Sequence, residues 1–96
     1  MSKTFRNLVF RPHSSDPKFG IQAKLELKEG KTLSVVAGRS MYSTINDKAA
    51  DLEYPDSNRF ISFEVGIIDK EGGVEVKGWQ NRDQINRLIK EYGYSR

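Results

Sequence analysis

The sequence predicts an α+β domain in which an antiparallel β-sheet of about five strands, arranged as a meander, packs on one C-terminal α-helix. The first observation is a run of alternating apolar and polar residues from Ile21 to Lys28, as in a strand buried on one face. The second is a capped, amphipathic pattern from Asn81 to Gly93. A chain of 96 residues is short for two cores, so residues 1–96 are predicted to form a single domain.

Three strands are expected in the first half of the chain. Phe5 to Phe10 is predicted to be the first, and it ends at Arg11-Pro12 because proline lacks a ladder donor. His13 to Pro17 has the composition of a loop. The alternating strand Ile21–Lys28 then turns at Glu29-Gly30 and returns as Lys31–Ala37, which predicts a hairpin.

The second half begins with an irregular segment from Arg39 to Arg59, of a length that is often functional in a compact domain. Phe60–Ile68 is predicted to be the next strand, and Val74–Trp79 the last. One face of Phe60–Ile68 is expected to carry its apolar residues, Ile61, Phe63, Val65 and Ile67.

The helix prediction depends on its two ends and one stripe. Asn81 can cap the first turn, with Gln84 three residues later as in a capping box and Asp83 near the positive end of the helix dipole. Gly93 is placed to end the helix. The stripe that faces the sheet consists of Ile85, Leu88, Ile89 and Tyr92.

One helix is too narrow for this sheet. Five strands span about 24 Å, whereas a helix of about 12 residues is roughly 18 Å long and about 10 Å across. The rest of the apolar face needs another cover. The Arg39–Arg59 segment, a curled sheet and a second copy of the chain are the candidates, and the last of these predicts a homodimer.

The composition excludes several classes of site and protein. The chain has no cysteine, which rules out disulfides, thiolate zinc sites and thiol nucleophiles. It has no apolar run of the roughly 20 residues that a membrane span needs. Met1 to Phe10 lacks the apolar core of a signal peptide. These features predict a cytoplasmic protein with no membrane association.

No residue pattern indicates catalysis, a metal or a cofactor. His13, Ser14 and Asp16 are too close in sequence for a catalytic arrangement, so a local hydrogen-bonding role for His13 is favoured. The glycines form no phosphate-binding motif. The acidic residues of the long segment lack calcium-loop spacing, which favours a solvated loop; they are Asp47, Asp51, Glu53 and Asp56.

Charge and aromatic residues favour a binding function. The net charge is +3, and since 44–58 carries −3, the rest of the chain carries +6. Bases and aromatics near the strand ends are the candidate contacts to a partner or an anionic ligand: Arg11, His13, Arg39, Tyr42 and Trp79. Bases of the first hairpin and its approach are the candidate contacts to single-stranded nucleic acid: Arg6, Lys24, Lys28 and Lys31.

Two resemblances suggest a setting. The elements expected over Phe60–Tyr92 are, in order, a strand, an acidic-glycine turn, a strand and a capped helix. This order resembles the C-terminal half of the transcriptional-coactivator single-stranded-DNA-binding fold. Most of the chain is similar to a family of small tailed-phage proteins with no established activity. The matching pieces are Phe10-x-Pro12-His13, Phe19–Ala23, Leu33–Gly38 with Tyr42-Ser43, and Phe63–Val65. Asp47–Asn58 is an insertion relative to that pattern.

The phage resemblance implies a small accessory protein that acts in the host cytoplasm. Such a protein would inhibit or redirect a host protein or a defence system by stoichiometric binding, without catalysis. A single-stranded nucleic-acid-binding protein is the alternative.

Overall fold

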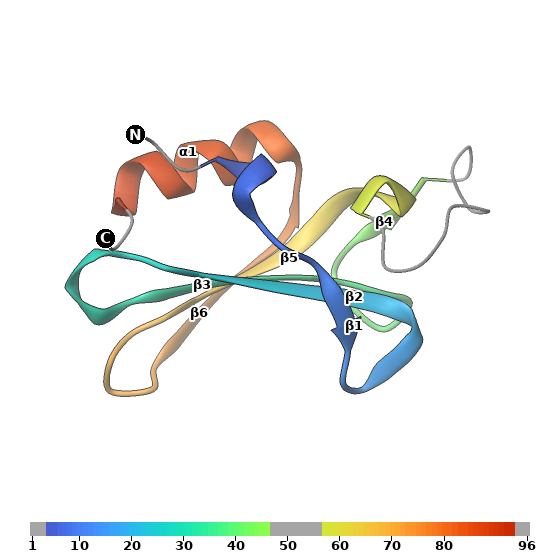
Figure 1. Cartoon of the computed structure of the whole chain (residues 1–96), viewed down its shortest axis with the longest axis horizontal. Helices are drawn as coiled ribbons and strands as arrows, with labels where there is room; N and C mark the ends of the chain where they lie inside the picture. The colour runs from blue at the N-terminus through green and yellow to red at the C-terminus, as the bar shows by residue number, and fades with distance from the viewer. Residues whose placement is uncertain (1–3, 47–56, 94–96) are drawn as a thin grey trace.

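The computed structural model describes residues 4–46 and 57–93, and this part of the chain has the predicted α+β fold. One α-helix lies over a twisted antiparallel sheet (Figure 1). In chain order the elements are η1 (Phe5–Asn7), β1 (Arg11–His13), β2 (Asp16–Glu26), η2 (Lys28–Gly30), β3 (Thr32–Ala37), β4 (Thr44–Ile45), η4 (Ser57–Arg59), β5 (Phe60–Ile68), β6 (Val74–Gln80) and α1 (Arg82–Tyr92).

The sheet is organised around β5. Its strand order is β1-β2-β3-β5, and the other edge of β5 is shared by two strands. The short β4 pairs with the start of β5, and β6 pairs with the rest of it. The predicted meander is therefore confirmed, with β4 as a further short strand in the segment expected to be irregular.

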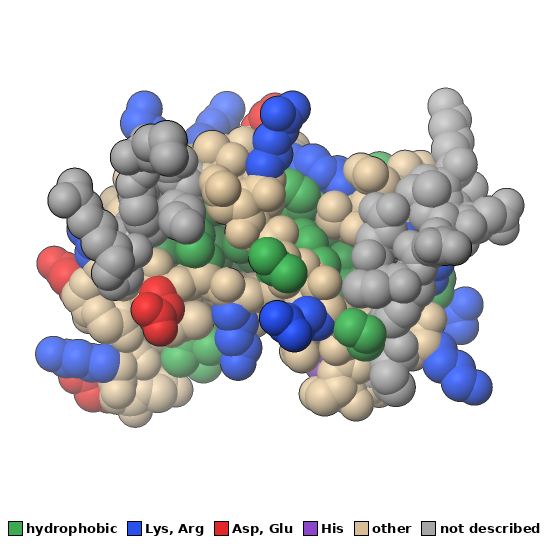
Figure 2. Space-filling view, in the orientation of Figure 1, with side chains coloured by type: hydrophobic (Ala, Val, Ile, Leu, Met, Phe, Trp, Pro, Cys, Tyr) green, Lys and Arg blue, Asp and Glu red, His purple; other side chains and the backbone are tan. Residues whose placement is uncertain are grey.

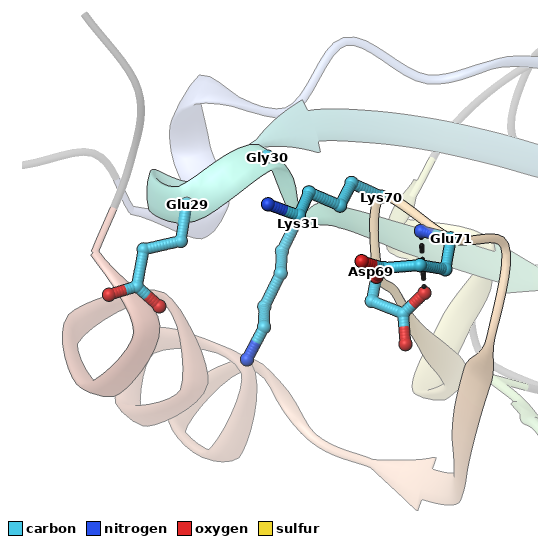
Figure 3. Close-up of a pocket in the computed structure, with 6 residues that line it drawn as sticks. All are labelled: Glu29, Gly30, Lys31, Asp69, Lys70 and Glu71. Atoms are coloured by element: carbon cyan, nitrogen blue, oxygen red, sulfur yellow. Dashed lines mark hydrogen bonds between the residues drawn. The ribbon is translucent and has the colours of Figure 1, made fainter.

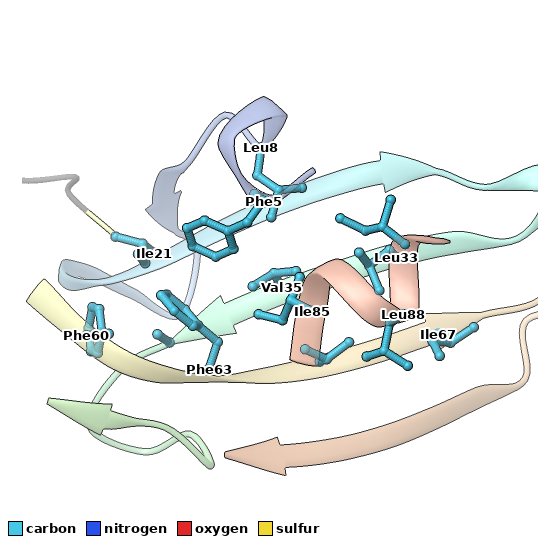
Figure 4. Packing of buried hydrophobic residues seen from close by; sticks show 14 of the residues in the cluster. Phe5, Leu8, Ile21, Leu33, Val35, Phe60, Phe63, Ile67, Ile85 and Leu88 are labelled. Atoms are coloured by element: carbon cyan, nitrogen blue, oxygen red, sulfur yellow. The ribbon is translucent and has the colours of Figure 1, made fainter. Parts of the chain in front are cut away.

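The core lies between the sheet and α1 (Figure 4). The pairs Val35–Val65 and Leu33–Ile67 face each other across β3 and β5, and all four side chains are buried. Above them, α1 contributes Ile85, Leu88 and Ile89, as its apolar stripe predicts. We call this face of the sheet, which packs against α1, the inner face.

The prediction of a strand over Phe5–Phe10 is wrong, because local capping favours a 3-10 turn there. Thr4 Oγ1 accepts from the Arg6 N–H at 3.3 Å, and Asn7 Oδ1 accepts from the Thr4 N–H at 2.9 Å. The Phe5 N–H donates to Asn86 Oδ1 on α1 at 2.7 Å.

This N-terminal segment is the missing cover for the inner face. The Phe5 ring centre lies 5.1 Å from that of Phe63 on β5, and the Phe10 ring centre lies 5.8 Å from it. Leu8 is buried in the same cluster. The segment therefore adds to α1 the apolar cover that a single helix could not supply.

The connections between β1 and β2 and between β2 and β3 are both short. Glu29 and Gly30 both have positive φ, 63° and 75°, as in the type I′ turn that suits a hairpin. His13 to Pro17, expected to be a loop, instead spans the end of β1, a short turn and the start of β2. Pro12 lies opposite Ile21 on the edge strand β1, where a missing N–H is tolerated.

The predicted caps of the helix are confirmed. Asn81 Oδ1 accepts from the Gln84 N–H at 2.8 Å, and Gln84 Oε1 accepts from the Asn81 N–H at 2.8 Å. Gly93 ends the helix with a positive φ of 72° and donates its N–H to the Ile89 carbonyl. Short-range capping chemistry therefore determines both ends of α1.

The predicted face of Ile61 is wrong. Ile61 is 50% exposed, whereas the neighbouring Phe60 and Phe63 are fully buried. Thr44 on β4 pairs with Ser62, whereas the next residue, Ile45, pairs with Phe60, two positions away on β5. The register between β4 and β5 therefore shifts within this stretch. The shift breaks the strict alternation on which the prediction depended.

Candidate protein-binding surface

The face of the sheet opposite α1, which we call the outer face, has no described helix over it (Figure 1). Side chains on adjacent positions of a strand point to opposite faces, so the residues between the buried ones point outward. Pairing aligns them in rows across the strands. One row is Lys24, Ser34, Gly66 and Val76, and the next is Glu26, Thr32, Ile68 and Val74.

A β-bulge turns Trp79 onto the outer face. Lys77 pairs with Val65 and Gln80 pairs with Phe63, so Gly78 and Trp79 together oppose the single residue Glu64. Without the bulge, strict alternation from Lys77 would direct Trp79 toward the inner face. Trp79 also has a positive φ of 51°, a conformation that a bulky residue rarely adopts, and its side chain is 59% exposed.

Tyr42 packs against Trp79 from the connection between β3 and β4. Their ring centres are 5.0 Å apart, and the Trp79 N–H donates to the Tyr42 carbonyl at 2.9 Å. The Tyr42 N–H donates to the outward-facing Glu64 carboxylate at 3.1 Å. A Cβ on Gly78 would lie 2.9 Å from the Tyr42 Cβ, so Tyr42 needs a glycine beneath it.

Two exposed valines extend this aromatic pair along β6. Val74 and Val76 are 57% and 55% exposed and face outward, opposite Ile68 and Gly66. Gly66 leaves space beside them, since the position of its missing Cβ lies 3.5 Å from Val74 Cγ1. The aromatic pair and the valines therefore form an apolar patch on the β6 side of the outer face.

Charges at the paired strand positions of the outer face are balanced. The register of β1, β2, β3 and β5 directs two bases, Arg11 and Lys24, and two acids, Glu26 and Glu64, to this face. At these paired positions the outer face thus has as many acids as bases. The outline of the molecule is indented on the side opposite α1 (Figure 2). The indentation lies between two protruding parts, where Figure 1 places the β5–β6 turn and the β1–β2 turn.

The structure brings together only two of the five residues predicted to contact a partner. Tyr42 and Trp79 form the pair described above. Arg11 and His13 lie on β1, at the opposite edge of the sheet from β6. Arg39 lies elsewhere, with its guanidinium 4.4 Å from the ring centre of Phe19.

His13 has the local role that the sequence favoured. Its Nδ1 accepts from the Ser15 N–H at 3.1 Å, and Ser15 Oγ lies 2.8 Å from the same nitrogen. These bonds close the turn between β1 and β2. The Asp16 side chain lies outside the described part of the structure, as do the four acids from Asp47 to Asp56.

The four bases proposed for nucleic-acid contact do not form one patch. Arg6 is exposed on η1, beside the helix layer, and Lys24 points to the outer face. Lys28 lies against Gly93, the cap of α1, and Lys31 Nζ lies 5.2 Å from the Tyr92 ring centre. Figure 2 accordingly shows Lys and Arg side chains spread over several parts of the visible surface.

A depression of about 610 Å³ lies between the η2 turn and the β5–β6 turn (Figure 3). Its lining residues are Glu29, Gly30, Lys31, Asp69, Lys70 and Glu71. One oxygen of the Asp69 carboxylate accepts from the N–H groups of Glu71 and Gly73 and so shapes the turn itself. The lining has no aromatic anchor. Among the described residues no group of three or more His, Cys, Asp or Glu side chains is placed to hold a metal.

The sequence did not identify Val74 and Val76 as surface residues. Their alternation with Glu75 and Lys77 indicates one apolar face of a strand, which is equally typical of a core strand. Only the position of α1 shows which face is covered.

Comparison of the chain with protein-family models, curated proteins and solved structures found no match. None of the helices in 4–46 and 57–93 is long and apolar enough to cross a membrane.

Proposed function

We propose that the protein acts by stoichiometric binding of a partner protein, without catalysis, and that the partner docks on the outer face around Tyr42 and Trp79. The observation that carries this proposal is the exposed aromatic pair beside two exposed valines, on a sheet face whose paired positions carry balanced charge. Centres of protein interfaces are enriched in tryptophan and tyrosine and depleted in charge, and a few such residues supply most of the binding energy.

The backbone at Trp79 supports a binding role. A positive φ at a non-glycine residue costs free energy, and such strain clusters at functional sites. The Trp79 side chain is too exposed to offset that cost by burial in the core. In the tailed-phage setting that the resemblance suggests, the partner is a host protein or defence factor that the chain inhibits or redirects.

The alternative, binding of single-stranded nucleic acid, has less support. Tyr42 and Trp79 could stack on bases, but nucleic-acid platforms combine such aromatics with a groove of positive charge. On the outer face, Arg11 and Lys24 are matched by Glu26 and Glu64. This matching of bases with acids therefore favours a protein partner over single-stranded nucleic acid.

The test compares the wild type with two variants as bait in a nuclease-treated host lysate. Trp79→Ser removes the anchor of the patch. Val9→Ser removes another exposed apolar side chain, 67% exposed against 59% for Trp79, that lies outside the sheet. A specific partner should be retained by the wild type and by Val9→Ser and lost with Trp79→Ser.

The recovered protein is then purified and titrated in a calorimeter. We expect a defined stoichiometry, and about 30-fold weaker binding by Trp79→Ser, as is typical of an interface hot spot. A partner that binds the wild type and Trp79→Ser equally well, or the absence of any nuclease-resistant partner, would contradict the proposal.

A further inference from the structure

The strand β6 is a long open edge of the sheet. It has seven residues and no proline, and within the described residues it pairs only with β5. The other edge strands are blunted, since β1 has three residues that include Pro12 and β4 has two. Unpaired backbone groups along such an edge are a template for pairing with another strand.

The backbone groups that face away from β5 can be identified. The Asp69 N–H donates to the Gly73 carbonyl at 2.9 Å, which makes this a hydrogen-bonded pair. Such pairs alternate along an antiparallel ladder, so Glu75 and Lys77 bond to β5 through their backbones. The N–H and C=O groups of Val74 and Val76 therefore point away from the sheet. Gly78 lies in the bulge, and its carbonyl accepts a hydrogen bond from Gln80 Nε2 at 3.1 Å.

We infer that two copies of the chain pair antiparallel through β6, with Val76 directly opposite Val76 of the second copy. In this register the two copies of Val76 exchange their outward backbone bonds, and Val74 lies opposite Gly78 of the second copy. Glu75 then lies opposite Lys77 of the second copy, on the α1 side of both sheets. Opposite charges in directly opposed positions stabilise a strand pair.

The charges of β6 also disfavour the neighbouring registers. A shift centred on Glu75 places the two copies of Glu75 opposite each other, and a shift centred on Lys77 does the same for the two lysines. Like charges in opposed positions destabilise a strand pair. Within one chain Glu75 and Lys77 already lie together, with Lys77 Nζ 3.3 Å from Glu75 Oε2.

Pairing of this kind joins the two sheets into one and places the exposed Val76 side chains side by side on the outer face. It uses the edge of the sheet, whereas the proposed partner protein uses its face. The dimer is therefore an independent property of the chain and does not rest on the proposed function.

The first test measures molecular mass by sedimentation over a range of protein concentrations. We expect a dimer for the wild type, and a dissociation constant about tenfold higher for Lys77→Glu, which opposes like charges at two symmetric positions. The double variant Glu75→Lys/Lys77→Glu should restore the wild-type value. Lys18→Glu makes the same charge change on β2 and should leave the dimer intact.

The second test reports on the register. Because the chain has no cysteine, a single Val76→Cys substitution introduces one thiol per copy. Opposed residues of a hydrogen-bonded pair have Cα atoms about 5.5 Å apart, close enough for oxidative cross-linking. Val74→Cys, on the same face of the same strand, separates the two thiols by about four residues, roughly 13 Å along the strands, and should not cross-link.

The inference is overturned by a monomer at every concentration, by a dimer that Lys77→Glu does not weaken, or by cross-linking of Val74→Cys in preference to Val76→Cys. Circular dichroism of each variant shows that it is folded, so a lost dimer is not mistaken for a lost fold.

Discussion

The ring of Tyr42 lies 5.0 Å from the ring of Trp79, and the Tyr42 carbonyl accepts a hydrogen bond from the Trp79 N–H at 2.9 Å. This relationship joins the β3–β4 connection to the end of β6. It holds two large side chains on the surface, 55% and 59% exposed, where they contribute little to the core. The strained backbone of Trp79 is thus combined with an exposed ring, as expected of a binding residue.

Replacing Trp79 by glycine should leave the protein more stable than replacing it by alanine. Both variants lose the ring contact with Tyr42, but only glycine relieves the positive φ of 51°, a difference of about 1 kcal/mol. Urea unfolding of the two variants measures it. In an ordinary strand position alanine is the more stable, so that order would show that Trp79 is not strained.

Gly78→Ala should disrupt the aromatic pair. The new Cβ would lie 2.9 Å from the Tyr42 Cβ, and such overpacking costs roughly 1–3 kcal/mol. Trp79 is the only tryptophan, so its fluorescence reports the loss of the Tyr42 contact. Gly66→Ala is the control on the same face: its Cβ meets Val74 at 3.5 Å, an ordinary contact, and both emission and stability should be retained.

Asn86→Ala should loosen the N-terminal segment. It removes the acceptor of the Phe5 N–H, a 2.7 Å bond that is partly buried, and an unsatisfied buried donor costs about 1–3 kcal/mol. Asn86→Asp keeps an oxygen acceptor and should lose less stability. Equal unfolding midpoints for Asn86→Ala and the wild type in urea would show that this bond does not hold the segment.

A fluorescence titration with labelled single-stranded DNA should be flat even at low salt. At the paired positions of β1, β2, β3 and β5 the outer face carries no net positive charge, and phosphate contacts dominate nucleic-acid affinity. Binding that weakens steeply with added salt and is reduced in Lys24→Ala would instead support the nucleic-acid alternative.

The features that the sequence predicted correctly are local ones. The cap formed by Asn81 and Gln84 lies within four consecutive residues, and the Glu29-Gly30 turn needs only its own backbone preferences. The features it missed depend on distant partners. The 3-10 turn at Phe5 is capped locally, but its place over the inner face depends on Asn86 and Phe63. The bulge that exposes Trp79 appears only in the register against β5.

The same dependence on distant partners explains why the sequence predicted only part of the candidate site. Tyr42 and Trp79 could be selected as aromatic residues, but their contact joins two segments far apart in the chain. Val74 and Val76 could be placed on one face of a strand, but not on the uncovered face. Which face α1 and η1 cover is a property of the whole packing.

The central position of β5 has a consequence for how the molecule opens. Because β5 pairs with β3 on one edge and with β4 and β6 on the other, its backbone amides are released only when several elements separate at once. Hydrogen–deuterium exchange should therefore be slowest in β5 and fastest at β1 and β4, which are short and paired on one side. If β6 pairs with a second copy, its outward amides at Val74 and Val76 should change from fast to slow exchange as the protein concentration rises.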